Sequence, residues 1–385
     1  MKLIHVITPG DHFSPLTGSA IPSVVHGLSS ALSYYGVQSG VVIDKTTQSE
    51  RYDSCEIIEV EYDLSGMRPA QRVYDLACGY LTSSRPNIAS KYSVVRTALR
   101  GEQNPIVVYH NTIYPGVAHK QEMSEHLVLS WWGNDLTRTY STRELTHSVS
   151  TLDGVVCCSN YIREQVISRL PKQVHSKVFT VLNGGPDPVP QLRSKRLSER
   201  PRILFLGRMV PQKGIHVLLQ AIMSNEFLSE SCDVVLLGSS GFSSTDPLSK
   251  YQQELQRLVV GKLKSVEFVP FQNRHSINSY IDSADVVVVP SVFEEPFGLV
   301  VLEANARGVP VIHSLRGGLL EASGGVGLCF DNEDVGELAW KLFYLLTNHS
   351  YYSRMSERSL DWARLSTWHV RGDSVCHLVE SLCRK

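Results

Sequence analysis

Residues 202–223 read RILFLGRMVPQKGIHVLLQAIM. Ile203–Leu206 is a short, continuous apolar run, which is typical of a strand buried on both faces of a parallel sheet. A loop with glycine and proline follows, and from Gly214 to about Met223 the apolar residues recur at helical spacing. Val234–Leu237 is again a run of strand type. The stretch therefore predicts two parallel strands joined by a helix, the repeating unit of a doubly wound sheet.

The same alternation continues through both halves of the chain. In the first half the predicted elements are strands at Leu3–Thr8, Val41–Ile43, Ile106–Tyr109, Leu127–Trp131, Val155–Cys158 and Val178–Leu182, with a helix through Val24–Tyr35 that Gly36 ends. In the second half they are strands at Val266–Val269, Val286–Val289 and Val309–Ile312, and helices at about Leu248–Val260, Ile277–Ser283 and Leu299–Arg307. Further helices are predicted to finish the chain.

A break in this pattern suggests two domains. Residues 183–201 carry four prolines and no apolar periodicity, which is typical of a linker. We predict an N-terminal Rossmann-like domain at 1–188, a linker at 189–200 and a C-terminal Rossmann-like domain at 201–352. The helices of 353–385, which include Trp368, are predicted to pack back on the N-terminal domain. The predicted fold class is α/β, with two doubly wound domains facing across a cleft and ligands beyond the carboxyl ends of the strands.

Composition narrows the class of protein further. The 385 residues are 42% apolar and 19% charged, and 37 basic residues against 38 acidic ones leave a net charge of -1, so nothing global indicates nucleic acid. Eight cysteines form no CxxC pair, which favours reduced thiols in the cytoplasm over zinc or disulfide chemistry. The start, MKLIHVITPG, is too short an apolar run for a signal peptide, and no stretch approaches the ~20 apolar residues of a membrane span. We expect a soluble, cytoplasmic chain, and the sequence predicts no oligomeric state.

Two clusters can carry chemistry, and both lie between a predicted strand and a predicted helix. Gly207 ends a strand, and Arg208 and Lys213 follow it just before a helix begins, where free amides and the helix dipole favour an anion such as a diphosphate. Taken alone, the two cations are explained equally well as ordinary surface residues.

The second cluster is EEPFGLVVLE at 294–303. Phe297, Gly298 and Leu299 would present backbone amides at the start of a helix. Glu295 and Glu303 would accept hydrogen bonds from sugar or ribose hydroxyls. One carboxylate near a helix start can be simple dipole complementation, but that alternative does not account for both glutamates.

The order GRMVPQKG followed by EPFGLVVLE resembles glycosyltransferase family 4, the retaining, nucleotide-sugar-dependent enzymes of GT-B architecture. The resemblance implies transfer of a hexose from a nucleotide-diphosphate sugar, a UDP-sugar or GDP-sugar, to a hydroxyl acceptor on a glycan, a lipid-linked or a small molecule. Arg208 and Lys213 would bind the diphosphate, with Glu295 against the donor sugar. These three are the predicted catalytic residues, and closure of the domains is expected to exclude water.

The resemblance also implies the rest of the donor site. Glu303 would hold the ribose, and Phe297, Gly298 and Leu299 would supply amides. The nucleobase would lie at Val269-Pro270-Phe271, with Gly207 and Gly238 ending the neighbouring strands, and Gly18 would lie in the turn near the phosphates. The predicted donor residues are Gly18, Gly207, Arg208, Lys213, Gly238, Pro270, Phe271, Glu295, Phe297, Gly298, Leu299 and Glu303.

The acceptor side matches less closely. His110 ends a strand that also ends in histidine in the family, but Trp132 stands where a second histidine is usual, which suggests an aromatic wall or a changed acceptor geometry. Asn134 and Asp135 are candidates for hydroxyl contacts. The alternatives are that His110 is a core histidine and that Asn134 and Asp135 cap the following helix.

The family's mechanism needs no metal and no protein nucleophile, because the leaving phosphate oxygen accepts the acceptor's proton. The sequence has no DxD motif, because Asp187 and Asp246 each occur without a second aspartate two residues away. We therefore expect no metal site and no required cofactor. Two other functions stay open: a GT-B epimerase that hydrolyses its donor, and a nucleotide-sugar-binding protein without turnover. A Rossmann dehydrogenase is disfavoured because no GxGxxG follows the first strand.

Arg85–Arg100 mixes basic and apolar residues, including Lys91 and Arg96. It predicts either a basic amphipathic helix that contacts a charged acceptor or the anionic inner face of a membrane, or a helix with one solvated face that packs on its own core.

Overall fold

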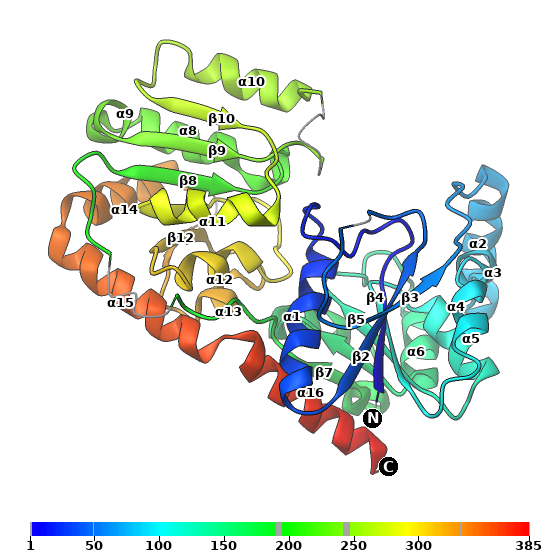
Figure 1. The fold of residues 1–385 in the computed structure, drawn as a ribbon. Helices are drawn as coiled ribbons and strands as arrows, with labels where there is room; N and C mark the ends of the chain where they lie inside the picture. The colour runs from blue at the N-terminus through cyan, green and yellow to red at the C-terminus, as the bar shows by residue number, and fades with distance from the viewer. Residues whose placement is uncertain (1, 49, 190–194, 242–246, 332, 385) are drawn as a thin grey trace. The chain divides into compact units, whose positions relative to one another are not determined.

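The computed structural model describes residues 2–48, 50–189, 195–241, 247–331 and 333–384. It divides into two compact units, and the chain passes from one unit to the other at Asn183/Gly184 and again at Thr367/Trp368. The second unit also takes in Pro15–Gly18. Part of the linker predicted at 189–200, residues 190–194, lies outside the described residues. Each unit has its own parallel sheet, which confirms the predicted α/β class with two Rossmann-like domains (Figure 1).

The first unit is a seven-stranded sheet in the order β3-β2-β1-β4-β5-β6-β7, with every neighbouring pair parallel. Its apolar strands are buried on both faces, as a sheet covered by helices requires. The elements are β1 (Lys2–Val6), α1 (Ala20–Tyr34), β2 (Gln38–Asp44), β3 (Glu56–Val60), α2 (Pro69–Thr82), α3 (Pro86–Ser90), α4 (Ser93–Ala98), β4 (Ile106–His110), α5 (Tyr114–Glu122), β5 (Leu127–Trp132), α6 (Thr142–Thr151), β6 (Gly154–Cys157), α7 (Asn160–Ile167), β7 (Val178–Thr180) and α16 (Trp368–Cys383).

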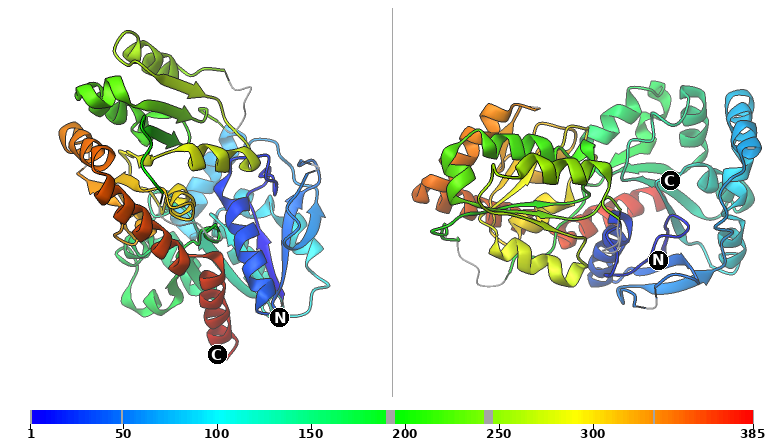
Figure 2. Two further views of the ribbon diagram at one scale, coloured as in Figure 1. Left: turned by 60° about the vertical axis from the view of Figure 1, so that its left-hand side comes forward. Right: turned by 90° about the horizontal axis from the view of Figure 1, so that it is seen from above.

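The second unit is a six-stranded parallel sheet in the order β10-β9-β8-β11-β12-β13. The view from above in Figure 2 shows its helices on both faces of the sheet. The elements are β8 (Arg202–Leu206), α8 (Ile215–Met223), α9 (Glu226–Ser231), β9 (Asp233–Leu237), α10 (Lys250–Val259), β10 (Val266–Val269), α11 (Arg274–Ser283), β11 (Val286–Val289), α12 (Leu299–Asn305), β12 (Val311–Ser314), α13 (Leu319–Ser323), β13 (Leu328–Phe330), α14 (Val335–Thr347) and α15 (His349–Leu365).

The C-terminal helices divide between the units. Helix α15 belongs to the second unit, whereas α16 belongs to the first and packs along α1 (Figure 1). The Tyr35 hydroxyl, just after α1, donates to the carbonyl oxygen of His369 in α16 at 3.2 Å. The last helix of the chain therefore completes the first unit. Among the described residues, no helix has both the length and the apolar character needed to cross a bilayer.

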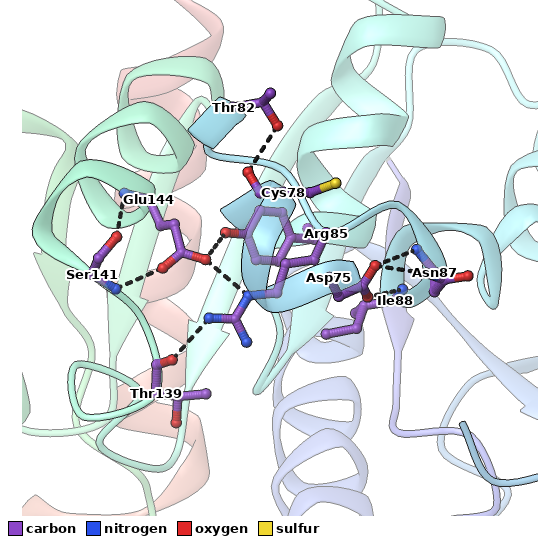
Figure 3. A network of polar contacts seen from close by, with 10 residues as sticks. Asp75, Cys78, Thr82, Arg85, Asn87, Ile88, Thr139, Ser141 and Glu144 are labelled. Carbon is purple, nitrogen blue, oxygen red and sulfur yellow. Dashed lines mark hydrogen bonds and ion pairs between the residues drawn. The ribbon is translucent and has the colours of Figure 1, made fainter. Parts of the chain in front are cut away.

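The segment Arg85–Arg100 is not one helix, so the prediction of a single helix was wrong, and contact of this segment with a membrane or a charged acceptor stays a prediction. It folds as the short helices α3 and α4. Arg85 and Arg96 turn inward, whereas Lys91 is half-buried and Arg100 is exposed. Arg85 is buried and pairs with Glu144 at 2.8 Å, and Arg96 is buried and pairs with Glu122 at 2.9 Å (the Arg85 pair is shown in Figure 3). These arginines hold the first unit together internally.

Candidate functional site

The predicted donor residues gather at one edge of the second sheet. Parallel strands all end at the same edge, so the loops that follow β8, β9, β10, β11 and β12 lie there together. These loops carry Arg208 and Lys213, Gly238, Pro270 and Phe271, Glu295 and, at the start of α12, Gly298 and Leu299. The predicted donor residues of four of these loops thus converge on one region.

The loop after β8 is fixed by backbone contacts to its neighbours. The N–H groups of Gly207 and Met209 donate to the carbonyl oxygens of Leu237 and Ser239, at 3.1 and 2.8 Å. Gly214 has φ +68°, and a Cβ there would lie 1.8 Å from the Pro290 carbonyl oxygen, so only glycine fits between this loop and the one after β11. Arg208 is exposed, and its Nε donates to the Ser240 carbonyl oxygen at 3.1 Å.

Lys213 and Glu295 form the centre of the cluster. Lys213 Nζ lies 2.6 Å from Glu295 Oε1, and the Ser291 hydroxyl donates to the same oxygen at 2.5 Å. Glu295 is 5% exposed, so its charge is compensated by two fixed donors as burial requires. An ammonium has three N–H donors, and the Lys213 side chain is 27% exposed. The Lys213 ammonium therefore keeps N–H donors and some accessible surface for an incoming anion.

A second ion pair fixes the loop after β11 to the loop after β12. Arg316 Nη1 lies 2.7 Å from Glu294 Oε1, and the other Glu294 oxygen accepts the N–H of Gly317 at 2.7 Å. The N–H of Gly318 donates to the Glu295 carbonyl oxygen at 2.7 Å. These contacts hold Glu295 from the backbone side, and the sequence reasoning did not identify them.

Glu303 lies on α12 and pairs with Arg274, the first residue of α11. Both side chains keep some exposure, 15% for Glu303 and 25% for Arg274. The sequence analysis missed Arg274 because its partner is 29 residues away in the chain. Its position at the end of the loop after β10 was the one available signal.

The predicted nucleobase segment is anchored to the strand beside it. The N–H of Phe271 donates to the Ser239 hydroxyl at 3.0 Å, and the N–H of Gly238 to the Val269 carbonyl oxygen at 2.9 Å. Pro270 is exposed and Phe271 half-buried. This leaves an accessible ring and backbone next to the Arg274–Glu303 pair.

The start of α12 brings Phe297, Gly298 and Leu299 into the same region. Gly298 precedes the first helical residue with φ +107°, and Phe297 is buried. The first amides of a helix have no acceptor within it. Gly18 also joins this side, because Pro15–Gly18 cluster with the second unit and the Arg274 N–H donates to the Pro15 carbonyl oxygen at 3.0 Å.

The acceptor-side residues lie in the first unit, and two of them are core residues. His110 ends β4, and its Nε2 lies 3.0 Å from Nδ1 of His5 on β1. Both imidazoles are buried, and burial lowers the pKa of His5 to about 3 and that of His110 well below its usual value. Trp132 is fully buried, and its Nε1 donates to the Ser130 hydroxyl at 2.9 Å. These contacts favour the packing alternatives, and contact with an acceptor stays a prediction.

Asp135 organises a turn and does not cap a helix. Its Oδ1 accepts the Thr137 N–H at 2.9 Å, while the next helix, α6, is capped by Ser141 and Glu144. The expected helix-capping role of Asn134 and Asp135 was therefore wrong. Asn134 is exposed, so both residues stay candidates for hydroxyl contacts.

In the described ranges, no group of three or more His, Cys, Asp or Glu side chains is placed to hold a metal ion. Asp246, named above for the absence of a DxD, lies outside the described residues.

Comparison with known families now adds to this geometry. A family model described as Glycosyl transferases group 1 matches residues 191–362, which include every strand-end loop described for the second sheet. These residues belong to the family Glycosyl transferases group 1. The resemblance to glycosyltransferases that the two sequence motifs predicted is confirmed for this part of the chain.

Curated relatives of this glycosyltransferase domain have varied names. The chain is 29% identical over 244 residues to Spore coat protein SA of Bacillus subtilis, covering 57% of this chain and 64% of that protein. It is 32% identical over 171 residues to D-inositol 3-phosphate glycosyltransferase of Corynebacterium glutamicum, covering 43% and 40%. The chain thus matches less than two thirds of the length of these relatives.

Solved structures resemble the whole chain. Anabaena HepE, solved with UDP and glucose, matches with a TM-score of 0.69 and 17% identity, covering 98% of this chain and 99% of that one. The catalytic domain of Starch Synthase IV from Arabidopsis thaliana, bound to ADP and acarbose, matches with a TM-score of 0.73 and 16% identity, covering 100% and 99%. At such identities the likeness establishes the fold of this chain and no more.

Proposed function

We propose that this chain is a retaining glycosyltransferase that moves a sugar from a nucleotide-diphosphate sugar to a hydroxyl acceptor without a metal ion. The observation that carries the proposal is the Lys213–Glu295 pair, held at 2.6 Å among five strand-end loops of the group 1 domain. A buried carboxylate that fixes a half-exposed ammonium is suited to a site that binds an anion next to hydroxyl groups.

The donor is proposed to bind along the edge of the second sheet. Arg208 and Lys213 bind the diphosphate, and amides of Phe297, Gly298 and Leu299 face its distal phosphate and the sugar. Glu295 accepts hydrogen bonds from the donor sugar. Arg208 is exposed and Lys213 half-buried, so both are accessible to such a ligand.

The nucleoside is proposed to lie one loop further along. Glu303 accepts hydrogen bonds from the ribose hydroxyls, with Arg274 holding its carboxylate in place. The base lies against Val269-Pro270-Phe271. Both UDP-sugars and GDP-sugars suit a site defined by backbone and one ring, and the UDP bound by HepE makes UDP-sugars the first donors to test.

The reaction is proposed to occur on one face of the donor sugar. The bond between the anomeric carbon and the leaving phosphate oxygen breaks as the acceptor oxygen bonds to that carbon from the same side. The acceptor's proton passes to the leaving phosphate oxygen, so configuration is retained and no protein nucleophile is needed. Arg208, Lys213 and the amides before α12 stabilise the negative charge that develops on the diphosphate.

The test is a turnover assay with UDP-glucose and GDP-glucose against a panel of glycan, lipid-linked and small hydroxyl acceptors. We expect acceptor-dependent release of the nucleotide, unchanged by EDTA, and a product whose anomeric configuration matches the donor by NMR. Donor consumption without acceptor would instead favour the epimerase or hydrolase alternative. Binding without any turnover would favour a nucleotide-sugar-binding protein.

A further inference from the structure

Helix α2 (Pro69–Thr82) has an inverted pattern of burial. Surface helices normally turn apolar side chains inward and polar ones outward. In α2 the buried residues are Asp75 and Gly79, whereas five large apolar or aromatic side chains are more than half exposed: Val73 66%, Tyr74 58%, Leu76 58%, Tyr80 76% and Leu81 65%. Nothing in the described chain covers this face.

The inner side of α2 is fastened by polar contacts, shown in Figure 3. The Asp75 carboxylate accepts the N–H groups of Asn87 and Ile88, both at 3.0 Å, and the Asn87 side-chain amide at 2.9 Å. Asp75 therefore caps α3, the next helix. This contact fixes the rotation of α2 about its axis and so directs the apolar side chains outward.

A second buried contact holds the C-terminal half of α2. A Cβ on Gly79 would lie 2.3 Å from Glu144 Oε1, so only glycine lets α2 approach this carboxylate. Glu144 accepts hydrogen bonds from Arg85 at 2.8 Å and from the Tyr114 hydroxyl at 2.6 Å. Burial alone would raise the pKa of Glu144, but hydrogen bonds from Arg85, Tyr114 and Ser141 lower it to about 2. The outward apolar face therefore rests on a rigid base.

The charges around this face are basic. Arg68 and Arg72 are exposed at the start of α2, and Arg143 is exposed with its Nη1 3.5 Å from the Tyr80 carbonyl oxygen. The one acidic residue of the helix, Asp75, is buried. Asp63 is an exposed acid before the helix, and hydrogen bonds from Ser65 lower its pKa, with a smaller contribution from Lys91.

We propose that the apolar face of α2, defined by Val73, Tyr74, Leu76, Tyr80 and Leu81, inserts into the surface of a bilayer that contains anionic phospholipid. Leucine and valine enter the acyl boundary, the tyrosines lie at the headgroup level, and the arginines contact lipid phosphates. A second copy of the chain fits less well, because a two-fold interface would bring like charges together. The inference is independent of the proposed donor site.

The test is flotation with vesicles of phosphatidylcholine alone or mixed with phosphatidylglycerol. The double variant Leu76→Gln/Leu81→Gln removes the centre of the face, and Arg68→Gln/Arg72→Gln removes its charge. The matched control is Val260→Gln/Leu365→Gln, because these residues are 75% and 64% exposed in the second unit. Circular dichroism melts establish that each variant is folded.

We expect the wild type to float with the mixed vesicles and the Leu76→Gln/Leu81→Gln variant to lose at least tenfold in binding. The arginine variant should lose its salt dependence and its preference for anionic lipid, and the control should float like the wild type. Absence of wild-type binding, or equal binding of the Leu76→Gln/Leu81→Gln variant, overturns the proposal. So does a dimer in analytical ultracentrifugation that this variant abolishes while vesicle binding stays absent.

Discussion

The two parallel sheets place different side chains at their carboxyl ends. In the second unit the loops at these ends carry Arg208, Lys213 and Glu295. Arg208 is exposed, and Lys213 and Glu295 form an ion pair. In the first unit they carry His110 and Trp132, which are buried and bonded to neighbours inside the sheet.

Strand order alone therefore does not make a polar site. The first six strands of each unit follow the same doubly wound order, yet only the described loops of the second sheet bring Lys213 and Glu295 together as a partly accessible ion pair. In the first unit, ionisable side chains such as Arg85 and Glu144 form buried contacts with one another. The predictions below test this division, from the largest expected effect to the smallest.

Removing the buried indole should destabilise the first unit and leave the donor site unchanged. We expect Trp132→Ala to lower the free energy of unfolding by about 3–5 kcal/mol, because it leaves a large cavity. Urea unfolding would measure the loss, and calorimetric titration with UDP should give an unchanged Kd at a temperature where the variant is folded. Normal stability combined with altered acceptor use would instead place Trp132 against the acceptor.

Removing either member of the central pair should reduce the transfer rate. We expect Lys213→Ala and Glu295→Ala each to slow turnover by roughly 10²–10³-fold, the effect of losing a charge-stabilising group. Lys45→Ala is a matched control, because Lys45 pairs with Glu61 at 2.5 Å on the surface of the first unit. Wild-type rates in the Lys213 and Glu295 variants would refute their assignment to the site.

The Arg274–Glu303 pair should determine donor affinity. Glu303→Ala should weaken nucleotide binding by about 1.5–3 kcal/mol, roughly 10- to 100-fold in Kd, as expected for hydrogen bonds to a charged group. Arg274→Ala should weaken it less, and Arg274→Lys should restore most of the loss if Arg274 acts by holding Glu303. If all three variants bound the nucleotide with the Kd of the wild type, the proposed contact between Glu303 and the ribose would be contradicted.

Mild acid should destabilise the first unit through its buried histidines. The pKa of His5 is lowered by burial from 6.5 to about 3, so below pH 6.5 the unfolded chain binds a proton that the folded chain does not. The stability that the neutral, buried His5 contributes is present above pH 6.5 and is lost as the pH falls towards 3. Between pH 7 and 5 the free energy of unfolding should decrease by roughly 2 kcal/mol. Glu144 adds to the loss only below about pH 4.5.

Urea unfolding at several pH values measures this slope. The His5→Gln variant is expected to show a flatter dependence between pH 7 and 5, since it removes the titrating group. A slope identical to that of the wild type would show that His5 is not responsible.

The sequence predicted the apolar strands well, because runs such as Val286–Val289 and Ile106–Tyr109 have no other stable environment. It missed β3 and β13, which are short, only partly buried strands at the sheet edges. It also missed α2, since its apolar residues do not turn towards a core.

At the candidate site, the two motifs predicted which residues converge but not how they are held. Glu295 and Lys213 follow from their motifs, whereas Arg274 and Arg316 find their carboxylates only through the fold. The sequence was equally limited in predicting burial. It placed Trp132 and His110 at strand ends, but whether they face a ligand depends on tertiary packing.

The most direct test of the division between the two sheets is hydrogen–deuterium exchange with and without UDP or GDP. We predict added protection at 207–214, 270–274 and 295–303 of the second unit, with little change at 110–135 of the first. Protection confined to 110–135, or none with either nucleotide, would contradict the assignment of the donor site to the second sheet.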